Sequence, residues 1–209
     1  MNDVVLFAEP RFISPYVYSC FVTLTEKGVP FETVTLDSTT GDTRRPLYLE
    51  RTVTGRVPSL AHGEFSLAES SAIVEYLEEA FPSPRVLPSN LEARARCRQL
   101  MSWLRSDDTA VIREERPSSG IFYGPKISPL SEQGVHAVQK LITVTERLLG
   151  GRRQLFDTWC IADAELAFML MRLVSANEVT PDSVRAYAEA QWSRPSVQAY
   201  VTHARLPSL

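Results

Sequence analysis

A chain of 209 residues, of which 44% are hydrophobic, has room for one large domain or two small ones with a buried core. Its 22 basic and 25 acidic residues nearly balance, for a net charge of −3 without any basic block, which argues against nucleic acid as a partner. The longest strongly apolar stretch, residues 166–174, is too short to span a bilayer, and the first residues do not resemble a signal peptide. We therefore expect a soluble, cytoplasmic protein with no membrane partner.

The first eighty or so residues alternate between strand-like and helix-like patterns. Short apolar runs and period-two alternation indicate strands, whereas apolar residues spaced by three and four indicate helices. The predicted elements in chain order are a strand at 4–7, a helix at 15–26, a strand at 31–36, a short helix at 44–51, a hairpin with strands at 57–60 and 64–67, and a helix ending at 81. This order predicts an α/β domain over residues 1–81.

Pro82, Pro84 and Pro88 then follow within seven positions, too densely for a regular element to continue. We assign residues 82–90 as a linker and residues 91–209 as a second domain, because every long segment beyond it has helical periodicity. The predicted helices are a long one at 91–116, one with an apolar stripe at 138–149, a buried one at 163–175, one that Thr180 caps with Pro181 as its first residue, and a last one opened by Pro195.

The cysteines and histidines do not form a site. Cys20, Cys97 and Cys160 are scattered, without a Cys-x-x-Cys pair and without histidines at metal-ligand spacing, so we expect neither a disulfide framework nor a metal site. Cys20 falls on the apolar stripe of its helix and is expected in the core. Cys160 and Asp163 have the spacing of a capping box in which a thiol replaces the usual hydroxyl, which should weaken that box.

Val57-Pro58 begins a predicted strand, in front of Ser59-Leu60, and the start of a strand is a costly place for proline because it cannot donate to the ladder. A cis bond would leave the N–H and C=O of Val57 pointing outward, free to pair with an extended peptide; a trans proline at a strand edge is the alternative. Glu69 and Ser70 open the next helix, where a carboxylate, a hydroxyl and free N–H groups can grip an ammonium and a carboxylate together. Plain helix capping by serine is the other reading, and the two roles can coexist.

The segments SPYV, RVPSL and ESSAI, followed by an all-helical half, resemble the cytosolic glutathione transferase superfamily. The stretches FISPYV, ESSAI, WLRSD, IREERP and WCIAD are most similar to those of the bacterial YfcF-like glutathione transferases. The resemblance implies an α/β thioredoxin-like N-terminal domain that binds glutathione, an all-α C-terminal helical bundle that contributes the electrophile site, and a homodimer. It implies an enzyme that activates the glutathione thiolate for attack on an electrophile or organic hydroperoxide, with glutathione as co-substrate and no metal. A non-enzymatic stress or interaction protein with the same fold is the alternative.

The same resemblance assigns the glutathione-binding residues. The backbone of Val57, before Pro58, contacts the cysteine of glutathione, Glu69 and Ser70 hold its γ-glutamyl end, and Arg56 is a candidate for its carboxylates.

Ser14 maps onto the catalytic position, where its hydroxyl can donate a hydrogen bond to the glutathione sulfur and favour the thiolate. A serine directly before Pro15 is also the ordinary cap of a helix, and that reading stays open. Tyr16 and Tyr18 are rivals for the catalytic hydroxyl, but both follow the helix start and are expected to pack.

Candidate walls for the electrophile lie in the helical half, at Trp103, Ile112, Arg113 and Tyr123. Trp103 and Ile112 could equally be core residues. Arg113, with Arg116 and the acids between them, could instead form a solvated or interdomain ion-pair face.

Overall fold

The computed structural model describes residues 3–125 and 128–207. These fall into two compact units, the first made of residues 3–86 with 199–207 and the second of residues 87–198. In the first unit the elements are β1 (Val4–Ala8), α1 (Pro15–Glu26), β2 (Glu32–Thr35), the 3-10 turn η1 (Asp42–Arg44), α2 (Pro46–Leu49), β3 (Ser59–His62), β4 (Phe65–Ala68) and α3 (Ser70–Ala80). The predicted order of strands and helices is confirmed, with the hairpin shifted by one or two residues. The predicted boundaries at 82–90 stay a prediction.

The four strands form one mixed sheet in the order β2-β1-β3-β4. β1 pairs with β2 in parallel and with β3 antiparallel, and β3 pairs antiparallel with β4. In this register Ser59, the first residue of β3, lies opposite Phe7 near the end of β1 and opposite Ala68 at the end of β4. The segments that follow β1, precede β3 and follow β4 therefore leave the sheet at the same end.

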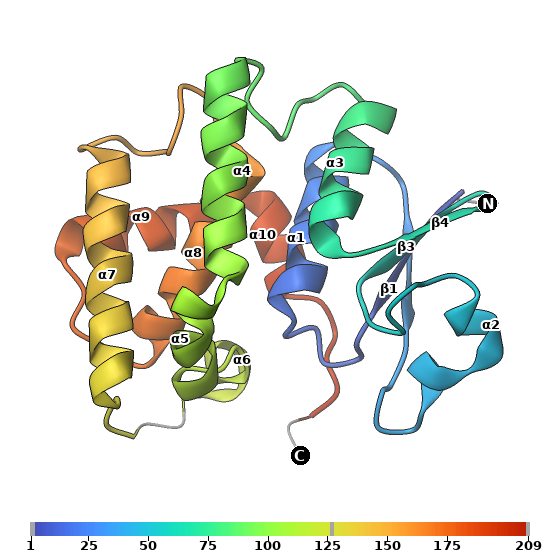
Figure 1. Ribbon diagram of the computed structural model, residues 1–209, viewed down its shortest axis with the longest axis horizontal. Helices are drawn as coiled ribbons and strands as arrows, with labels where there is room; N and C mark the ends of the chain where they lie inside the picture. The colour runs from blue at the N-terminus through green and yellow to red at the C-terminus, as the bar shows by residue number, and fades with distance from the viewer. Residues whose placement is uncertain (1–2, 126–127, 208–209) are drawn as a thin grey trace. The chain divides into compact units, whose positions relative to one another are not determined.

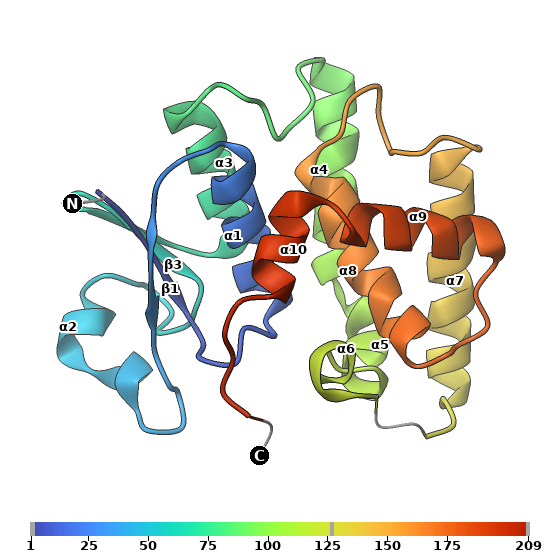
Figure 2. The ribbon, with the colours of Figure 1, turned by 180° about the vertical axis from the view of Figure 1, so that it is seen from behind.

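Helices α1 and α3 lie side by side against one face of the sheet (Figures 1 and 2). Val17, Leu24, Ile73 and Leu77 on these helices are fully buried, as is Leu6 on β1. Burying these side chains is the main source of stability for such a unit, at about 1.5–3 kcal/mol for each large aliphatic side chain. The packing fixes the positions at which both helices begin, and both begin at the sheet end just described.

The second unit is entirely helical, as predicted. Its elements are α4 (Leu91–Arg105), the 3-10 turn η2 (Asp107–Thr109), α5 (Ala110–Glu115), α6 (Ser119–Tyr123), α7 (Glu132–Leu149), α8 (Ile161–Ser175) and α9 (Asp182–Trp192). α10 (Pro195–Val201) begins here and ends in the first unit. Helix α8 is buried along nearly its whole length, as predicted from a sequence that is apolar on nearly every face.

Two predictions in this unit are wrong. The single helix expected over 91–116 is broken, because Ser106 adopts an extended conformation that ends α4 before η2 and α5. Thr180 does not cap α9, whose cap position is taken by Pro181 without any side-chain bond; the Thr180 hydroxyl donates to the carbonyl of Glu178 instead. Within the described residues, no helix is long and apolar enough to cross a membrane.

Candidate functional site

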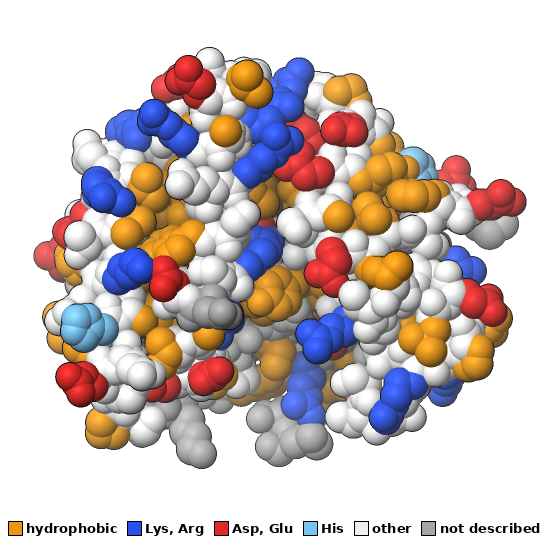
Figure 3. Space-filling model, in the orientation of Figure 1, with side chains coloured by type: hydrophobic (Ala, Val, Ile, Leu, Met, Phe, Trp, Pro, Cys, Tyr) orange, Lys and Arg blue, Asp and Glu red, His pale blue; other side chains and the backbone are white. Residues whose placement is uncertain are grey.

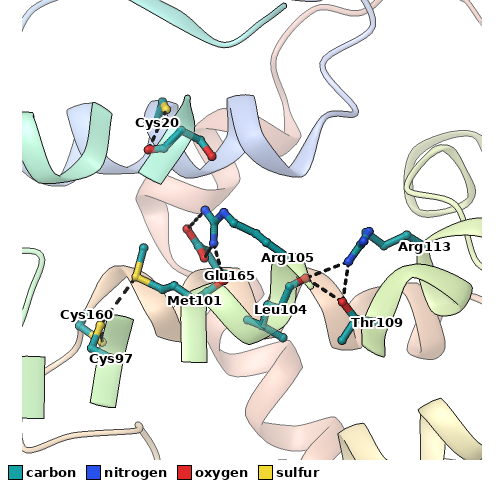
Figure 4. Close-up of polar contacts among 10 residues, drawn as sticks. Cys20, Cys97, Met101, Leu104, Arg105, Thr109, Arg113, Cys160 and Glu165 are labelled. Atoms are coloured by element: carbon teal, nitrogen blue, oxygen red, sulfur yellow. Dashed lines mark hydrogen bonds and ion pairs between the residues drawn. The ribbon is translucent and has the colours of Figure 1, made fainter. Parts of the chain in front are cut away.

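Most of the residues predicted to form a site meet at one end of the sheet in the first unit. Ser14 follows β1, Val57 precedes β3 and Glu69 follows β4, and the strand register brings all three connections to that end. The Cys20 thiol contacts the Ser70 carbonyl at 3.8 Å and so joins α1 to the first residue of α3 (Figure 4). Cys20 is fully buried, as predicted for a core residue.

The Val57-Pro58 peptide is cis, as predicted. Pro58 is buried and Val57 is half-buried. Among the described residues, neither the N–H nor the carbonyl of Val57 has a hydrogen-bond partner. Such an unpaired backbone pair beside a strand is suited to an extended peptide, which can add to it as a short strand-like segment.

Tyr48 holds this segment in place, a role that sequence reasoning missed. Its buried hydroxyl donates to the Arg56 carbonyl at 2.8 Å and lies 3.0 Å from the Ser59 hydroxyl, so it contacts both sides of the Val57-Pro58 bond. Burial raises the pKa of Tyr48, and the Ser59 hydrogen bond partly offsets that effect, which keeps the phenol protonated as a donor. The Arg56 side chain is exposed.

Glu69 occupies the cap position of α3 with φ 72° and ψ 115°, in the left-handed half of the map that a non-glycine residue seldom adopts. Its side chain makes no cap hydrogen bond, and within the described residues the exposed carboxylate has no partner. Ser70 is the first helical residue and is buried. The alternative in which Ser70 or Ser71 is the cap residue is therefore wrong, because that position belongs to Glu69.

Ser14 caps α1. Its Oγ accepts hydrogen bonds from the N–H groups of Tyr16 and Val17, both at 3.3 Å, and its carbonyl accepts from Tyr18 N–H at 2.9 Å. The capping reading is confirmed, but it uses only the lone pairs of the hydroxyl oxygen. The hydroxyl hydrogen has no acceptor within the described residues, so the half-buried Ser14 can still donate one hydrogen bond.

The rival tyrosines differ in exposure. Tyr18 is fully buried and packs edge-on against Tyr200 at 5.2 Å between ring centroids, whereas Tyr16 is 36% exposed. The expectation of a packing role is confirmed for Tyr18.

Glu9, which the sequence did not single out, lies directly beside Ser14. Its Oε1 accepts from the N–H groups of Ile13 at 2.8 Å and Ser14 at 2.7 Å, and its Oε2 accepts from Phe12 N–H at 2.5 Å. Burial raises the pKa of Glu9, and the backbone hydrogen bonds partly offset that effect. Tyr200 also reaches this loop, donating from its hydroxyl to the Ser14 carbonyl at 3.1 Å.

The four wall candidates of the second unit have different surroundings. Ile112 is fully buried in the core of that unit. The Arg113 guanidinium donates to the Leu104 carbonyl and to the Thr109 hydroxyl (Figure 4), and also to the Ser106 carbonyl, so it satisfies carbonyls at the C-terminal end of α4. Tyr123, at the end of α6, is half-buried.

Trp103 is half-buried and lines a cavity of about 730 Å³ in the second unit. Its Nε1 donates to Asp108 at 3.1 Å, and Lys140 pairs with the same carboxylate at 2.6 Å. Cations at Arg96, Arg147 and Arg152 share the lining with apolar side chains from α4 and α7.

The predicted ion-pair face around Arg116 is not solvated. Arg116 is 4% exposed, and its Nε donates to Glu178 Oε1 at 2.6 Å inside the second unit. Glu114 is the exposed acid of this segment, whereas Glu115 is half-buried and its carboxylate accepts from Ser131 N–H at 3.0 Å. The expectation of a solvated or interdomain face is therefore wrong for Arg116.

All three cysteines are free and buried. Cys160 N–H donates to Asp163 Oδ2 at 3.0 Å, so Asp163 serves its half of the capping box as predicted. The Cys97 and Cys160 sulfurs lie 3.8 Å apart, and their hydrogen bond together with burial raises the pKa of the Cys160 thiol far above its usual range. Within the described part of the chain, no group of three or more histidine, cysteine or acidic residues could hold a metal ion.

Two protein-family models match this chain. Residues 12–85 match a family model described as glutathione S-transferase, N-terminal domain, and residues 90–205 match the model for its C-terminal domain. Glutathione S-transferase F10 of Arabidopsis thaliana is 40% identical over 130 residues, which are 61% of this chain and 57% of that protein. Glutathione S-transferase 3 of Zea mays is 29% identical over 220 residues, covering 99% of this chain and 97% of that protein.

The fold of this chain is also similar to that of a solved glutathione transferase structure. A glutathione transferase homologue from a Burkholderia strain, BGR1, was crystallised with bound glutathione; it is 38% identical, with a TM-score of 0.76 and 95% of each chain covered.

Proposed function

The chain belongs to the glutathione S-transferase family, and we propose that it binds glutathione at the sheet end described above and activates the thiol for attack on an electrophile or an organic hydroperoxide. One observation carries the proposal. The unpaired backbone of Val57 and the unpartnered carboxylate of Glu69 lie at the same end of the sheet as Ser14, whose hydroxyl hydrogen has no acceptor among the described residues.

Glutathione is an extended tripeptide with a free ammonium, two carboxylates and a thiol. In the proposed complex Val57 pairs with the backbone of its cysteine, as one strand pairs with another, next to the buried ring of Pro58. The Glu69 carboxylate takes the ammonium of the γ-glutamyl end, and Ser70, at the start of α3, takes its carboxylate through its hydroxyl and its N–H, the latter favoured by the helix dipole. Arg56 is exposed and can pair with a remaining carboxylate.

The proposed chemistry depends on the Ser14 hydroxyl. An ordinary thiol has a pKa of roughly 8.5, and lowering it by about two units requires roughly 2.7 kcal/mol of preference for the thiolate. A hydrogen bond to a charged group contributes about 1.5–3 kcal/mol, so one hydroxyl donor is of the required size. Two N–H groups already donate to Ser14 Oγ, which polarises the O–H bond and strengthens it as a donor.

The activated thiolate has two reactions. With an electrophile, its sulfur bonds to the electrophilic carbon and the leaving group departs with the bonding electrons. With a hydroperoxide, sulfur takes the terminal oxygen and the alcohol leaves after protonation. A second glutathione then reduces the resulting sulfenic acid, giving glutathione disulfide and water.

Calorimetric titration with glutathione, run beside an activity panel of aromatic halides, organic peroxides and small mixed disulfides, tests the proposal. Ser14→Ala should lower kcat by about tenfold to a hundredfold with little change in glutathione affinity, since it removes an interaction needed for the thiolate. Glu69→Ala and Ser70→Ala should instead weaken binding by about tenfold or more, because each removes a contact to a charged end of the ligand.

Ser14→Ala also removes a helix cap, which by itself costs about 0.5–2 kcal/mol of stability. Ser131→Ala is the matched control, because Ser131 caps α7 through Gly134 N–H at 3.0 Å in the second unit and has no assigned role in the chemistry. Ser14→Thr, which keeps both the cap and the donor, should retain most of the activity. Wild-type turnover in Ser14→Ala would remove Ser14 from the proposal, and glutathione binding without any turnover would favour a non-enzymatic interaction protein.

For the electrophile site we propose Trp103 and Tyr123, because both are half-buried whereas Ile112 is fully buried and the Arg113 donors already serve α4. Trp103→Ala and Tyr123→Ala should each raise KM for an aromatic electrophile and leave KM for glutathione unchanged. Equal changes in both constants would argue against this assignment.

We further propose that the chain is a homodimer. Phe65 is 47% exposed and packs on Tyr76 at 5.0 Å between ring centroids, and the Tyr76 hydroxyl lies 2.7 Å from His62 Nδ1. Hydrophobic side chains gather beside a histidine over the β3–β4 hairpin and α3 (Figure 3), and an exposed aromatic cluster of this kind is typical of an interface. Light scattering should show a dimer for the wild type and a monomer for Phe65→Glu; a Phe65→Glu dimer would exclude this face.

Placement in the YfcF-like branch, and in the cytoplasm, is likewise part of the proposal. The segments WLRSD, IREERP and WCIAD support the branch, and three free cysteines fit a reducing compartment. Fractionation of cells that express the protein tests the compartment, and the relative rates with peroxides and mixed disulfides test the branch.

A further inference from the structure

We propose that Glu9 is a positioning residue for thiol activation: its carboxylate holds the loop 10–14 in the one conformation that presents the Ser14 hydroxyl for donation. The inference rests on the proposed role of Ser14 and adds a residue that neither the sequence motifs nor the family comparison indicated.

The carboxylate of Glu9 accepts hydrogen bonds from three consecutive backbone N–H groups, those of Phe12, Ile13 and Ser14, at 2.5, 2.8 and 2.7 Å. Hydrogen bonds from N–H groups to a carboxylate are stronger than those between neutral groups. Three of them on one half-buried side chain fold the loop around Glu9.

The loop needs such a restraint because it does not follow an ordinary path. Phe12 has φ 47°, which is unfavourable for a bulky residue, yet its side chain is 1% exposed. The ring of Phe12 stacks on His203 at 3.8 Å between centroids, and Arg205 Nε donates to the Phe12 carbonyl at 3.2 Å. The C-terminal segment therefore fixes the outside of the loop while Glu9 fixes its inside.

These contacts leave Ser14 with one free hydrogen-bonding direction. Its N–H donates to Glu9, its carbonyl accepts from Tyr18 N–H and from the Tyr200 hydroxyl, and its Oγ accepts from the N–H groups at the start of α1. Within residues 3–125 and 128–207, only the hydroxyl hydrogen of Ser14 has no hydrogen-bond partner. Because every other polar atom of Ser14 is held, that hydrogen is directed to a defined place, which is the requirement for stabilising a charge that forms during a reaction.

The charge of Glu9 by itself works against the thiolate, since a nearby anion disfavours a second one. The two possible effects of Glu9 therefore have opposite signs. If Glu9 acts mainly as a charge, neutralising it lowers the pKa of the bound thiol and speeds the reaction. If Glu9 acts by positioning Ser14, neutralising it raises that pKa and slows the reaction.

Glu9→Gln separates the two effects, because glutamine keeps the size of the side chain but replaces one acceptor oxygen with an amide that donates. Ultraviolet absorbance of the thiolate reports the pKa of glutathione bound to the full chain, and steady-state kinetics with an aromatic halide report kcat and KM. We expect Glu9→Gln to raise the thiol pKa and to lower kcat on the order of tenfold, with KM for glutathione changed less than about threefold. Glu9→Asp, which keeps the charge but is one methylene shorter, should fall between Gln and the wild type.

Asp42→Asn is the matched control. Asp42 also accepts a backbone N–H, that of Asp37 at 3.0 Å, and lies in the same unit outside the loop 10–14. It should leave the thiol pKa and kcat as in the wild type, which shows that losing a carboxylate of this kind does not in itself disturb the chemistry.

An unchanged or lowered thiol pKa in folded Glu9→Gln, with wild-type kcat, overturns the positioning role while the proposed function stands. If Glu9→Gln does not fold, the thiol pKa of Glu9→Asp decides in the same way. A wild-type protein that binds glutathione without forming a thiolate and without turnover overturns the proposed function, and the role of Glu9 with it.

Discussion

Replacing Lys27 with methionine should cause one of the larger losses of stability available in the first unit. The Lys27 side chain is 0% exposed, and its ammonium donates to Glu78 Oε2 at 2.7 Å, to the Phe81 carbonyl at 2.7 Å and to the Pro84 carbonyl at 3.0 Å. Glu78, 3% exposed, also accepts from Val86 N–H at 3.0 Å. One ion pair thus joins the C-terminal ends of α1 and α3 to the segment that follows α3.

Lys27→Met keeps most of the apolar stem but leaves two carbonyls without a donor, and it leaves the buried Glu78 carboxylate with the more distant and exposed cation of Arg85, at 3.7 Å. Removing one partner of a buried pair costs about 3–5 kcal/mol. For a chain of this size each kcal/mol lowers Tm by about 2–4 °C, so the melting temperature should fall by roughly 6–20 °C. Urea unfolding followed by circular dichroism measures the free energy directly.

Two variants sharpen the test. The double variant Lys27→Met with Glu78→Leu should recover part of the loss, since it removes the stranded charge. Lys140→Met breaks an exposed pair with Asp108 and should change stability little, because solvent screens such pairs. A Lys27→Met protein within about 1 kcal/mol of the wild type would refute the assignment of this pair as a structural clamp.

Three more results are expected. Tyr48→Phe, which removes the hydrogen bond to the Arg56 carbonyl, should weaken glutathione binding by about threefold to tenfold in calorimetry, and an unchanged Kd would exclude this role. Asp163→Ala leaves the buried N–H groups of Leu155 and Cys160 without the carboxylate that accepts from them, removes the carboxylate acceptor of the Tyr187 hydroxyl, and should cost about 3–5 kcal/mol in urea unfolding; a loss below about 1 kcal/mol would contradict the geometry. The Ser131 hydroxyl and N–H lower the pKa of Glu115 from 4.5. The contribution of ionised Glu115 to folding stability is therefore present at neutral pH and is lost as pH falls through the lowered value. The difference in the free energy of unfolding between wild type and Glu115→Gln should therefore shrink in acid. A difference that grows in acid would mean that folding raises the pKa of Glu115 instead of lowering it.

The elements with local signals are those that the sequence predicted well. Helix α1 runs over Pro15–Glu26, the predicted range, because a serine, a proline and an apolar stripe define its start and Gly28 ends it within a few residues. The break between α4 and α5 was not predictable in this way. At this break the Arg113 side chain donates to the carbonyls of Leu104 and Ser106 at the end of α4, and sequence periodicity does not predict a contact of this kind.

The residues of the proposed binding site also differ in how far the sequence signals them. Two pairs are recognisable in the sequence because their residue types are unusual at those positions. Val57-Pro58 places a proline at the start of a strand, and Glu69-Ser70 places a carboxylate at the start of a helix. Glu9 gives no such signal, because a single acid between a strand and a helix reads as an ordinary surface residue. Its role follows only from the fold of the loop, which Tyr200 and Arg205 support from nearly two hundred residues further along the chain.

The two helices that carry the site are restrained along their length. Ser14 opens α1 and Ser70 opens α3 at the sheet end, the Cys20 thiol joins the two helices at Ser70, and Lys27 with Glu78 joins their far ends. The position of the Ser14 hydroxyl relative to Glu69 is thus set by buried contacts that have no chemical role themselves. Substitutions at the far clamp should consequently lower stability before they alter glutathione affinity, whereas substitutions in the loop around Glu9 act on the hydroxyl directly. Substitutions at one end of the two helices therefore change stability, and substitutions at the other end change thiol activation.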